Sequence, residues 1–154
     1  MLPALKIATI SVKNTKHILE TFLLKQIKTM SKRVLAIDDE RMNLLLFKGM
    51  FKNFDITLTT ALSGSEGIDY HKENKFDLIL TDFNMPSMNG IQTLNILREF
   101  DRSMNTYTPI FLITAVDNKS ISEWKEFSFN EILFKPIDIE LLKTLINQYL
   151  FSNQ

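Results

Sequence analysis

Acidic, hydroxyl and ammonium side chains follow short apolar runs in this sequence of 154 residues. Asp38 and Asp39 follow one run, and Asp82, Thr114 and Lys135 each stand just after another. Carboxylates brought close together repel each other unless a cation or raised pKa values relieve the repulsion. Mg²⁺ is the cation that we expect, because it takes one or two carboxylates and also binds phosphate oxygens. Zinc is not expected, because the chain has no cysteine and only two histidines.

The apolar runs themselves predict β-strands, because each is too short for a helix and is rich in branched or aromatic residues. The predicted strands are 34–37, 56–58, 78–80, 110–113 and 132–134. Segments with helical apolar spacing follow them at 42–52, 65–72, 91–100, 120–127 and 139–150. This alternation predicts an α/β fold, a (βα)5 doubly wound parallel five-stranded sheet with helices on both faces. The polar residues would then meet at the carboxyl edge of the sheet, where ligands bind in such folds.

Composition and charge exclude several other classes of protein. The chain has 18 basic and 18 acidic side chains and 45% hydrophobic residues, which is typical of one soluble globular domain. We expect a cytoplasmic protein without a membrane span, because no apolar run is long enough to cross a bilayer. Residues 31–154 hold 13 basic and 17 acidic side chains without a basic stripe, so direct binding to nucleic acid is not expected.

Residues 1–31 are expected to form an extension ahead of the main domain, which we place at 32–154. Residues 1–30 hold five lysines and one acidic residue. A short strand over 5–12 and an amphipathic helix over 17–27 are predicted there. We interpret the helix as a packing or linker helix, with a membrane-surface helix as the alternative. Met30 is an alternative start of translation, because Ser31-Lys32-Arg33 leads directly into the first predicted strand.

Four motifs, in this order, resemble the receiver domains of two-component response regulators. They are Asp38-Asp39, residues 82–90 (DFNMPSMNG), Thr114-Ala115 and Lys135-Pro136. The resemblance covers residues 32 to about 150. It implies a flavodoxin-like, CheY-like fold in which the strand order is 2-1-3-4-5.

The resemblance also implies a magnesium-dependent phosphoacceptor. Asp82 would accept a phosphoryl group from a histidine kinase or a phosphotransfer protein. Asp38, Asp39, Asp82 and the backbone carbonyl of Asn84 would hold Mg²⁺, for which Mn²⁺ could substitute. The chain would catalyse only its own phosphorylation and dephosphorylation, and would not be an enzyme in any other sense. A carboxylate can serve as a covalent nucleophile, which is consistent with this role.

Other positions would bind the phosphoryl group and report its presence. Thr114 and Lys135 would each contact a phosphoryl oxygen, and Asn84 and Val116 would tune hydrolysis. Ile132 occupies the place of an aromatic switch residue of the family, so repacking would occur there without a hydroxyl. The peptide bond between Lys135 and Pro136 would be cis. A downstream protein would contact residues 118–150, including Trp124 and Phe127.

Asn43 and the sequence Lys135-Pro136-Ile137 resemble receivers of hybrid kinases and phosphorelays more than those of DNA-binding regulators. Four residues follow the last predicted helix, so we expect a stand-alone receiver that acts by contact or as an intermediate in a phosphorelay. By the same family analogy, the helix over 42–51 would select the kinase.

Three other functions fit the sequence less well than a phosphoacceptor does. A phosphorylation-independent receiver-like interaction module would be expected if one of the central residues were missing, and none is. A magnesium-dependent aspartyl-phosphate phosphatase would need a second acid two residues after Asp82, where Asn84 stands. A flavin-binding protein would need a phosphate loop where Asp38-Asp39 stands. His17 faintly resembles a phosphoaccepting histidine on a helix, and His71 is expected to be solvated.

Overall fold

We describe the protein from a computed structural model, in which residues 17, 19–21, 31–115 and 127–152 are described. The chain divides into two units, Met1–Ser31 and Lys32–Gln154, each of which is treated by itself. In the first unit, residues 17 and 19–21 are helical, and the Thr21 hydroxyl donates a hydrogen bond to the His17 carbonyl at 2.8 Å. The predicted strand over 5–12 and most of the predicted helix over 17–27 lie outside the described residues.

The second unit alternates strands and helices, as the sequence predicts. Each predicted element that falls within the described residues is present, with ends shifted by up to three residues. The predicted helix over 120–127 lies almost wholly outside the described residues. The described elements are β1 (Lys32–Ile37), α2 (Arg41–Met50), the 3-10 turn η1 (Phe51–Asn53), β2 (Ile56–Ala61), α3 (Gly64–Glu73), β3 (Leu78–Asp82), α4 (Gly90–Ser103), β4 (Ile110–Thr114), β5 (Glu131–Phe134) and α6 (Ile139–Leu150).

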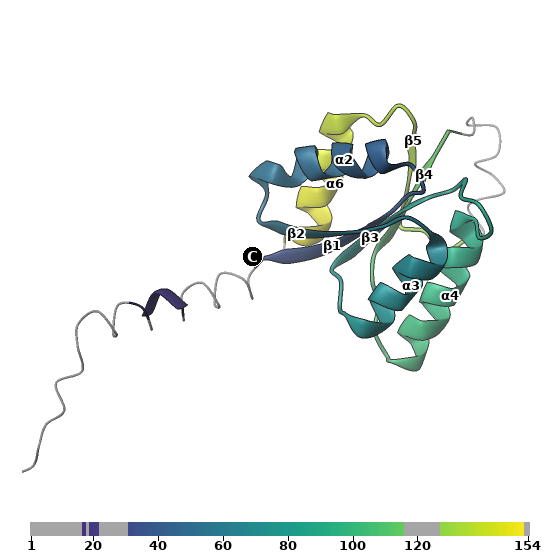
Figure 1. Cartoon of the computed structure of the whole chain (residues 1–154), viewed down its shortest axis with the longest axis horizontal. Coiled ribbons are helices and arrows are strands. Elements are labelled where there is room, and N and C mark those ends of the chain that lie inside the picture. The colour runs from purple at the N-terminus through teal and green to yellow at the C-terminus, as the bar shows by residue number, and fades with distance from the viewer. Residues whose placement is uncertain (1–16, 18, 22–30, 116–126, 153–154) are drawn as a thin grey trace, which may run out of the picture. The chain divides into compact units, whose positions relative to one another are not determined.

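The five strands form one parallel sheet in the order β2-β1-β3-β4-β5. This order confirms the predicted doubly wound fold. Helices α2 and α6 cover one face of the sheet, and α3 and α4 cover the other (Figure 1). Because β1 and β3 are neighbours at the centre, their carboxyl ends lie side by side. Among the described helices, none combines the length and the apolar character that a bilayer crossing requires.

The core has two halves, one on each side of the sheet, because side chains along a strand point alternately to opposite faces. In β1, Val34 and Ala36 pack toward α2 and α6, whereas Leu35 and Ile37 pack toward α3 and α4. All four side chains are at most 1% exposed. Burial on both faces explains why these strands are continuous apolar runs.

Capping residues fix where the helices begin. The Ser63 hydroxyl accepts from the Glu66 amide at the start of α3, and the Asp138 carboxylate accepts from two amides at the start of α6. A capping box that the sequence analysis did not identify starts α4. There Asn89 and Gln92 each accept a hydrogen bond from the other's backbone amide.

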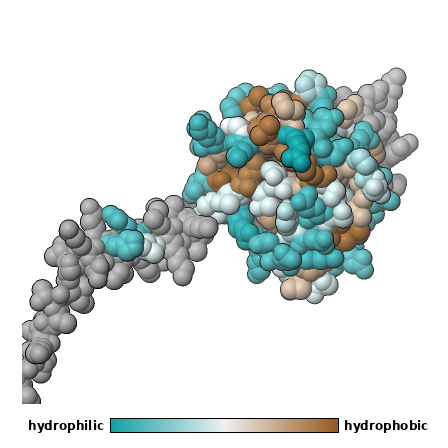
Figure 2. Space-filling model, viewed as in Figure 1, coloured by the Kyte–Doolittle hydropathy of each residue, from teal (hydrophilic) through white to brown (hydrophobic). Residues whose placement is uncertain are grey.

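Exposed apolar side chains gather on the side of the domain that α2 and α6 form (Figure 2). They include Met42, Leu45 and Leu46 on α2, which are 68%, 57% and 58% exposed, and Ile139 and Leu141 on α6. Three large apolar side chains within five positions of one helix make a contiguous patch, which we call the α2 patch (Met42, Leu45, Leu46). Patches of this kind mark contact surfaces more often than scattered single residues do.

Candidate functional site

Two buried carboxylates lie next to each other at the carboxyl edge of the sheet. Asp82 is the last residue of β3, and Asp38 follows β1 directly. Asp82 is 4% exposed and Asp38 is 1% exposed. Because β1 pairs with β3 in parallel register up to Ile37 and Thr81, the two acids extend from adjacent strand ends. The fold therefore brings together acids that are 44 positions apart in the sequence.

Lys135 joins these carboxylates. Its ammonium nitrogen lies 2.5 Å from Asp82 Oδ1 and 3.2 Å from Asp38 Oδ2. The side chain comes from the residue that follows β5 and is 25% exposed. One cation between two anions offsets part of their repulsion and leaves the trio with a net negative charge.

Backbone and side-chain amides hold the Asp38 carboxylate in place. Oδ1 accepts from the Glu40 backbone amide at 2.8 Å and from Asn43 Nδ2 at 3.0 Å. Oδ2 accepts from Asn43 Nδ2 at 2.9 Å and from Lys135 at 3.2 Å. Asn43 lies in the first turn of α2, so the start of this helix is fastened to the site. From the sequence, Asn43 indicated only a resemblance to receivers of hybrid kinases and phosphorelays, and the contact of Asn43 with Asp38 was not predicted.

Burial and charge act in opposite directions on the central pair. Burial raises the pKa of Asp82 above its usual value, the Lys135 ammonium lowers it, and the nearby Asp38 carboxylate raises it again, so that the net shift is upward. Burial lowers the pKa of Lys135, but its contacts with Asp82 and Asp38 outweigh this effect and raise the pKa overall. The environment therefore favours a proton or another cation at the carboxylates.

The remaining predicted metal ligands are more exposed than Asp38 and Asp82. Asp39 is exposed, and Asn84, which is also exposed, lies in the loop after β3. The Asn84 backbone contributes a hydrogen bond that lowers the pKa of Asp82. Within residues 31–115 and 127–152, no three acidic or histidine side chains are gathered tightly enough to be a ready-made metal cage. The donors that are present, two buried carboxylates carrying an incompletely neutralised charge, are hard oxygens of the type that Mg²⁺ prefers.

Thr114 and Ile132 lie on β4 and β5, the two strands that follow β3 in the order of the sheet. Thr114 is the last residue of β4 and is fully buried. It pairs in register with Phe134, the residue before Lys135. Ile132 is partly buried on β5 and pairs with Leu112.

The remaining sequence predictions concern one peptide bond and three side chains. The peptide bond between Lys135 and Pro136 is cis. Val116 and Trp124 lie outside the described residues, whereas Phe127 is partly buried against the α3 and α4 half of the core.

Gly90 lets α4 begin close to the end of β3. A Cβ atom placed on Gly90 would lie 2.6 Å from the Asp82 backbone oxygen and 2.9 Å from Leu112 Cδ1. The Gly90 amide donates to the Phe83 carbonyl at 2.9 Å, which closes the loop after Asp82. This close approach explains a glycine at the first position of α4.

The expectation for His71 was wrong. Its side chain is buried, and Nε2 lies 2.8 Å from Asp101 Oδ1. The ring also packs against Phe76 and Phe100. His71 faces α4 because it lies on the same inner side of α3 as Ile68. The polar neighbours Lys72 and Glu73 led to the prediction of an exposed position. The pair lies outside the carboxylate centre and joins two helices.

Comparison with known proteins finds a family that most of the chain matches. A family model of the response regulator receiver domain matches residues 34–147. Hybrid signal transduction histidine kinase I of Dictyostelium discoideum is 30% identical over 121 residues, which are 75% of this chain and 7% of that protein. The chain therefore spans only a small part of that relative.

Solved structures agree on the fold. The receiver domain of Saccharomyces cerevisiae Ssk1, crystallised with the histidine phosphotransfer protein Ypd1, has a TM-score of 0.71 and 20% identity, covering 78% of this chain and 89% of that one. The receiver domain of sensor histidine kinase PA1611 from Pseudomonas aeruginosa has a TM-score of 0.69 and 20% identity, covering 79% and 99%. That structure has a magnesium ion coordinated in its active-site cleft.

Proposed function

The chain belongs to the response regulator receiver domain family, the receivers of two-component and phosphorelay systems, and we propose that it accepts a phosphoryl group on Asp82. The observation that carries this proposal is the placement of one ammonium between two buried carboxylates at the edge of the sheet. Asp82 supplies a nucleophilic oxygen, and Lys135 supplies a mobile positive charge beside it. Phosphoryl transfer depends mainly on positioning and charge neutralisation, which these residues provide.

In the transfer step, a carboxylate oxygen of Asp82 forms a bond to the phosphorus of a donor phosphohistidine. The phosphorus–nitrogen bond breaks, and its electron pair leaves with the imidazole of the donor. Lys135 moves with the growing negative charge from the carboxylate to a phosphoryl oxygen. Thr114, at the end of the neighbouring strand, hydrogen-bonds another phosphoryl oxygen. Water later hydrolyses the acyl phosphate, and Asn84 and Val116 set the rate of that step.

Asp38, Asp39, Asp82 and the backbone carbonyl of Asn84 are the residues that would hold Mg²⁺, or Mn²⁺ in its place. When bound, the ion supplies charge neutralisation to the phosphoryl oxygens. The incomplete neutralisation of Asp38 and Asp82 by one lysine supports this assignment. Asp39 follows Asp38 directly in the chain and is exposed, so its carboxylate would be available to the ion.

The phosphodonor is a histidine kinase or a phosphotransfer protein. We assign its contact to the α2 patch, because α2 begins at the site and exposes three large apolar side chains. Asn43 of the same helix contacts Asp38, so a partner on this helix is close to the reacting carboxylate. A downstream protein recognises the phosphorylated state through residues 118–150. Ile132 stands where the family has an aromatic switch residue, so the change at this position is a repacking of an aliphatic side chain.

Incubation of the full chain with acetyl phosphate and Mg²⁺, followed by intact mass measurement, tests this function. We expect one phosphoryl adduct that is absent from Asp82→Ala and absent without Mg²⁺. Asp77→Ala is the matched control, because Asp77 is exposed at the opposite end of β3. Consumption of acetyl phosphate must be followed in parallel, because rapid hydrolysis would hide the adduct. Neither adduct nor consumption would contradict the proposal and favour a phosphorylation-independent interaction module.

The prediction of a stand-alone, cytoplasmic receiver remains a prediction, as does the division into residues 1–31 and 32–154. An immunoblot of the endogenous protein would test the first point, because fusion to an output domain would raise its mass. Limited proteolysis of the purified chain would test the second, and a stable fragment beginning near Lys32 is the expected product.

A further inference from the structure

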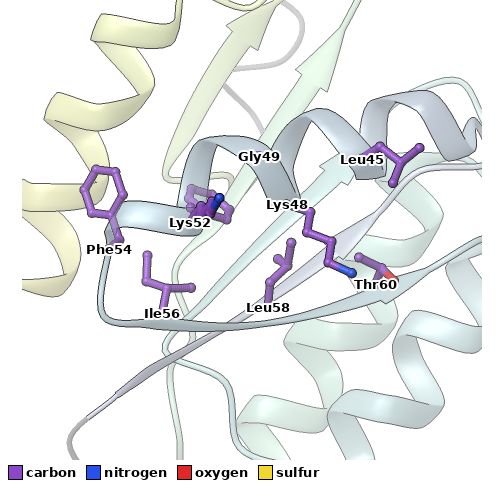
Figure 3. Close-up of a pocket in the computed structure, with 9 residues that line it drawn as sticks. Leu45, Lys48, Gly49, Lys52, Phe54, Ile56, Leu58 and Thr60 are labelled. Atoms are coloured by element: carbon purple, nitrogen blue, oxygen red, sulfur yellow. The ribbon is translucent and has the colours of Figure 1, made fainter.

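A groove lies between α2 and β2, away from the carboxylate centre. Its volume is about 680 Å³, and none of its lining residues belongs to the candidate site. Figure 3 shows Leu45 and Lys48 of α2 beside Leu58 and Thr60 of β2 along its length. Phe51, Phe54 and Ile56 complete the apolar part of the lining. The groove is thus an apolar channel that runs beside a strand.

That strand is the edge of the sheet. Only β1 pairs with β2 in the described sheet, so the other side of β2 faces outward. Its sequence, ITLTTA, has no charged residue and no proline. Natural edge strands are commonly protected by charges, proline or bulges, because an open edge accepts another strand. The β2 strand has neither a charge nor a proline of its own.

Two lysines stand along the groove without a counter-charge. Lys48 and Lys52 are exposed and line it, and no acidic residue does. Within the described part of the chain, neither ammonium has an ion-pair partner. Residues 31–154 carry more acidic than basic side chains, so the groove is positively charged on a domain whose net charge is negative. The groove is complementary to a ligand with carboxylates.

Gly49 gives a further indication that something approaches this surface. It lies within α2, and glycine stabilises a helix less than alanine does. A Cβ atom placed there would meet nothing within 4 Å, so packing inside this domain gives no reason for a glycine. Gly49 lines the groove. Its missing side chain leaves room for a ligand to lie close to the helix backbone.

We infer that the groove between α2 and β2 binds an extended acidic segment of a partner protein, which pairs with β2 as a sixth strand. Alternate side chains of such a strand would point into the groove, where apolar ones meet Leu58 and Ile56. Carboxylates of the segment would pair with Lys48 and Lys52. A second copy of the chain fits less well, because pairing of β2 with β2 would bring the lysines of both copies together.

The probe is a fluorescein-labelled octapeptide of two Val-Thr-Glu-Thr repeats, in which valine and glutamate share one face of the strand, and the same peptide with lysine in place of glutamate is its charge control. Fluorescence anisotropy with the full chain measures affinity, and amide hydrogen exchange locates the contact. We expect the acidic peptide to bind and to protect the amides of β2, and the basic peptide not to bind. Protection elsewhere, or equal binding of both peptides, would overturn the inference.

Substitutions separate binding from folding. Lys48→Glu with Lys52→Glu is expected to weaken the acidic peptide about tenfold, whereas Lys75→Glu, on an exposed loop, leaves affinity unchanged. Gly49→Leu is expected to raise the melting temperature, because leucine is the better helix former, and to weaken binding about tenfold. Unchanged affinity in both variants would overturn the inference. Protection of β2 that grows with protein concentration, without peptide, would assign the groove to a second copy instead.

Discussion

The side-chain amide of Asn43 donates to both carboxylate oxygens of Asp38, at 3.0 Å and 2.9 Å. Together with the Glu40 amide and Lys135, it accounts for four hydrogen-bond contacts to one carboxylate. A carboxylate accepts about four such bonds. A cation at Asp38 must therefore displace one of these donors, and Lys135 is the one with a second carboxylate to pair with.

Asn43 consequently orients Asp38 when Lys135 leaves it. Asn43→Ala is expected to weaken Mg²⁺ binding about tenfold, because hydrogen-bond partners of metal ligands typically contribute at this level. Isothermal titration with Mg²⁺ measures the affinity, and circular dichroism checks the fold. Asn95→Ala, at an exposed position of α4, is the control. Equal Mg²⁺ affinity in Asn43→Ala and the original chain would contradict this role, whereas no Mg²⁺ binding by the original chain would contradict the proposed metal site itself.

Lys135 relieves the repulsion between Asp38 and Asp82 in the absence of a metal. Lys135→Met is expected to lower the free energy of unfolding by about 2 kcal/mol, because two buried carboxylates lose their shared cation. Mg²⁺ should then stabilise this variant more than the original chain, since binding to the folded state adds stability. Urea unfolding with and without Mg²⁺ measures both effects.

Lys143→Met provides the comparison for that experiment. Lys143 pairs with Glu140 at 2.8 Å on the surface of α6, where an ion pair contributes little. We expect a change of at most about 0.5 kcal/mol and no added response to Mg²⁺. If both lysine variants lose the same stability, Lys135 has no special role in neutralising the site.

Asp82 should give the stability of the protein a distinct dependence on pH. Burial raises the pKa of Asp82 against the opposing effect of Lys135, so the folded protein holds this proton more tightly than the unfolded chain does. The stabilising contribution is fully present below the unfolded value of 3.8 and is lost as the pH rises through the higher folded pKa.

Asp82→Asn removes this titration. The free energy of unfolding of the original chain, minus that of Asp82→Asn, should therefore fall as the pH rises above 3.8. Guanidinium unfolding at several pH values without Mg²⁺ provides both quantities. A difference that rises with pH over this range would show that the charged form of Asp82 is the one favoured by the fold.

Much of this arrangement could be predicted from sequence because its causes are local or periodic. Apolar runs bounded by polar residues located the strands, and strict alternation with helices predicted a parallel sheet. In such a sheet Asp38, Asp82, Thr114 and Lys135 must share one edge, whatever the details of packing. The caps at Ser63 and Asp138 are local features of the same kind, because a cap depends on a few neighbouring residues.

The features that were missed depend on side chains meeting across elements. His71 has polar neighbours in sequence, and only the packing of α3 on α4 brings it to Asp101. The contact of Asn43 with Asp38 could more easily have been predicted, because an asparagine in the first turn of a helix can reach back to the end of the preceding strand. Nothing in the sequence around Gly49 indicated a groove, because the groove depends on how α2 packs beside β2.

The two glycines Gly90 and Gly49 should respond to alanine in opposite directions. Gly90→Ala places a Cβ atom 2.6 Å from the Asp82 backbone oxygen, so we expect a loss of about 2 kcal/mol in the free energy of unfolding. Gly49→Ala meets no atom and gains helix propensity, so we expect a gain of about 0.5 kcal/mol. Urea unfolding measures both. Equal effects of the two substitutions would contradict the close approach of α4 to β3.

Asp101 should be the acid on which the packing of α3 against α4 depends most. Its carboxylate lies 2.8 Å from His71 Nε2, accepts from the Thr108 amide at 2.8 Å, and lies 3.5 Å from the Arg98 guanidinium. Asp101→Ala leaves these donors buried without their acceptor, and we expect a loss of about 3 kcal/mol in the free energy of unfolding. Asp69→Ala, at an exposed position of α3, is the control and should change stability by less than about 0.5 kcal/mol.

The same variant shows whether the Asp101 network acts on the site or only on the fold. Arg98 also donates to the Ser128 carbonyl at 2.9 Å and to Asn130 Oδ1 at 3.0 Å, just ahead of β5. These bonds do not involve Asp101, so the approach of β5 to β4 is retained in Asp101→Ala, and Lys135 stays at the carboxylates. We therefore expect the Mg²⁺ affinity of Asp101→Ala to match that of the original chain at a temperature where both are folded. A tenfold loss of Mg²⁺ affinity, about 1.4 kcal/mol, would instead mean that the helix pair carries strain to the sheet edge.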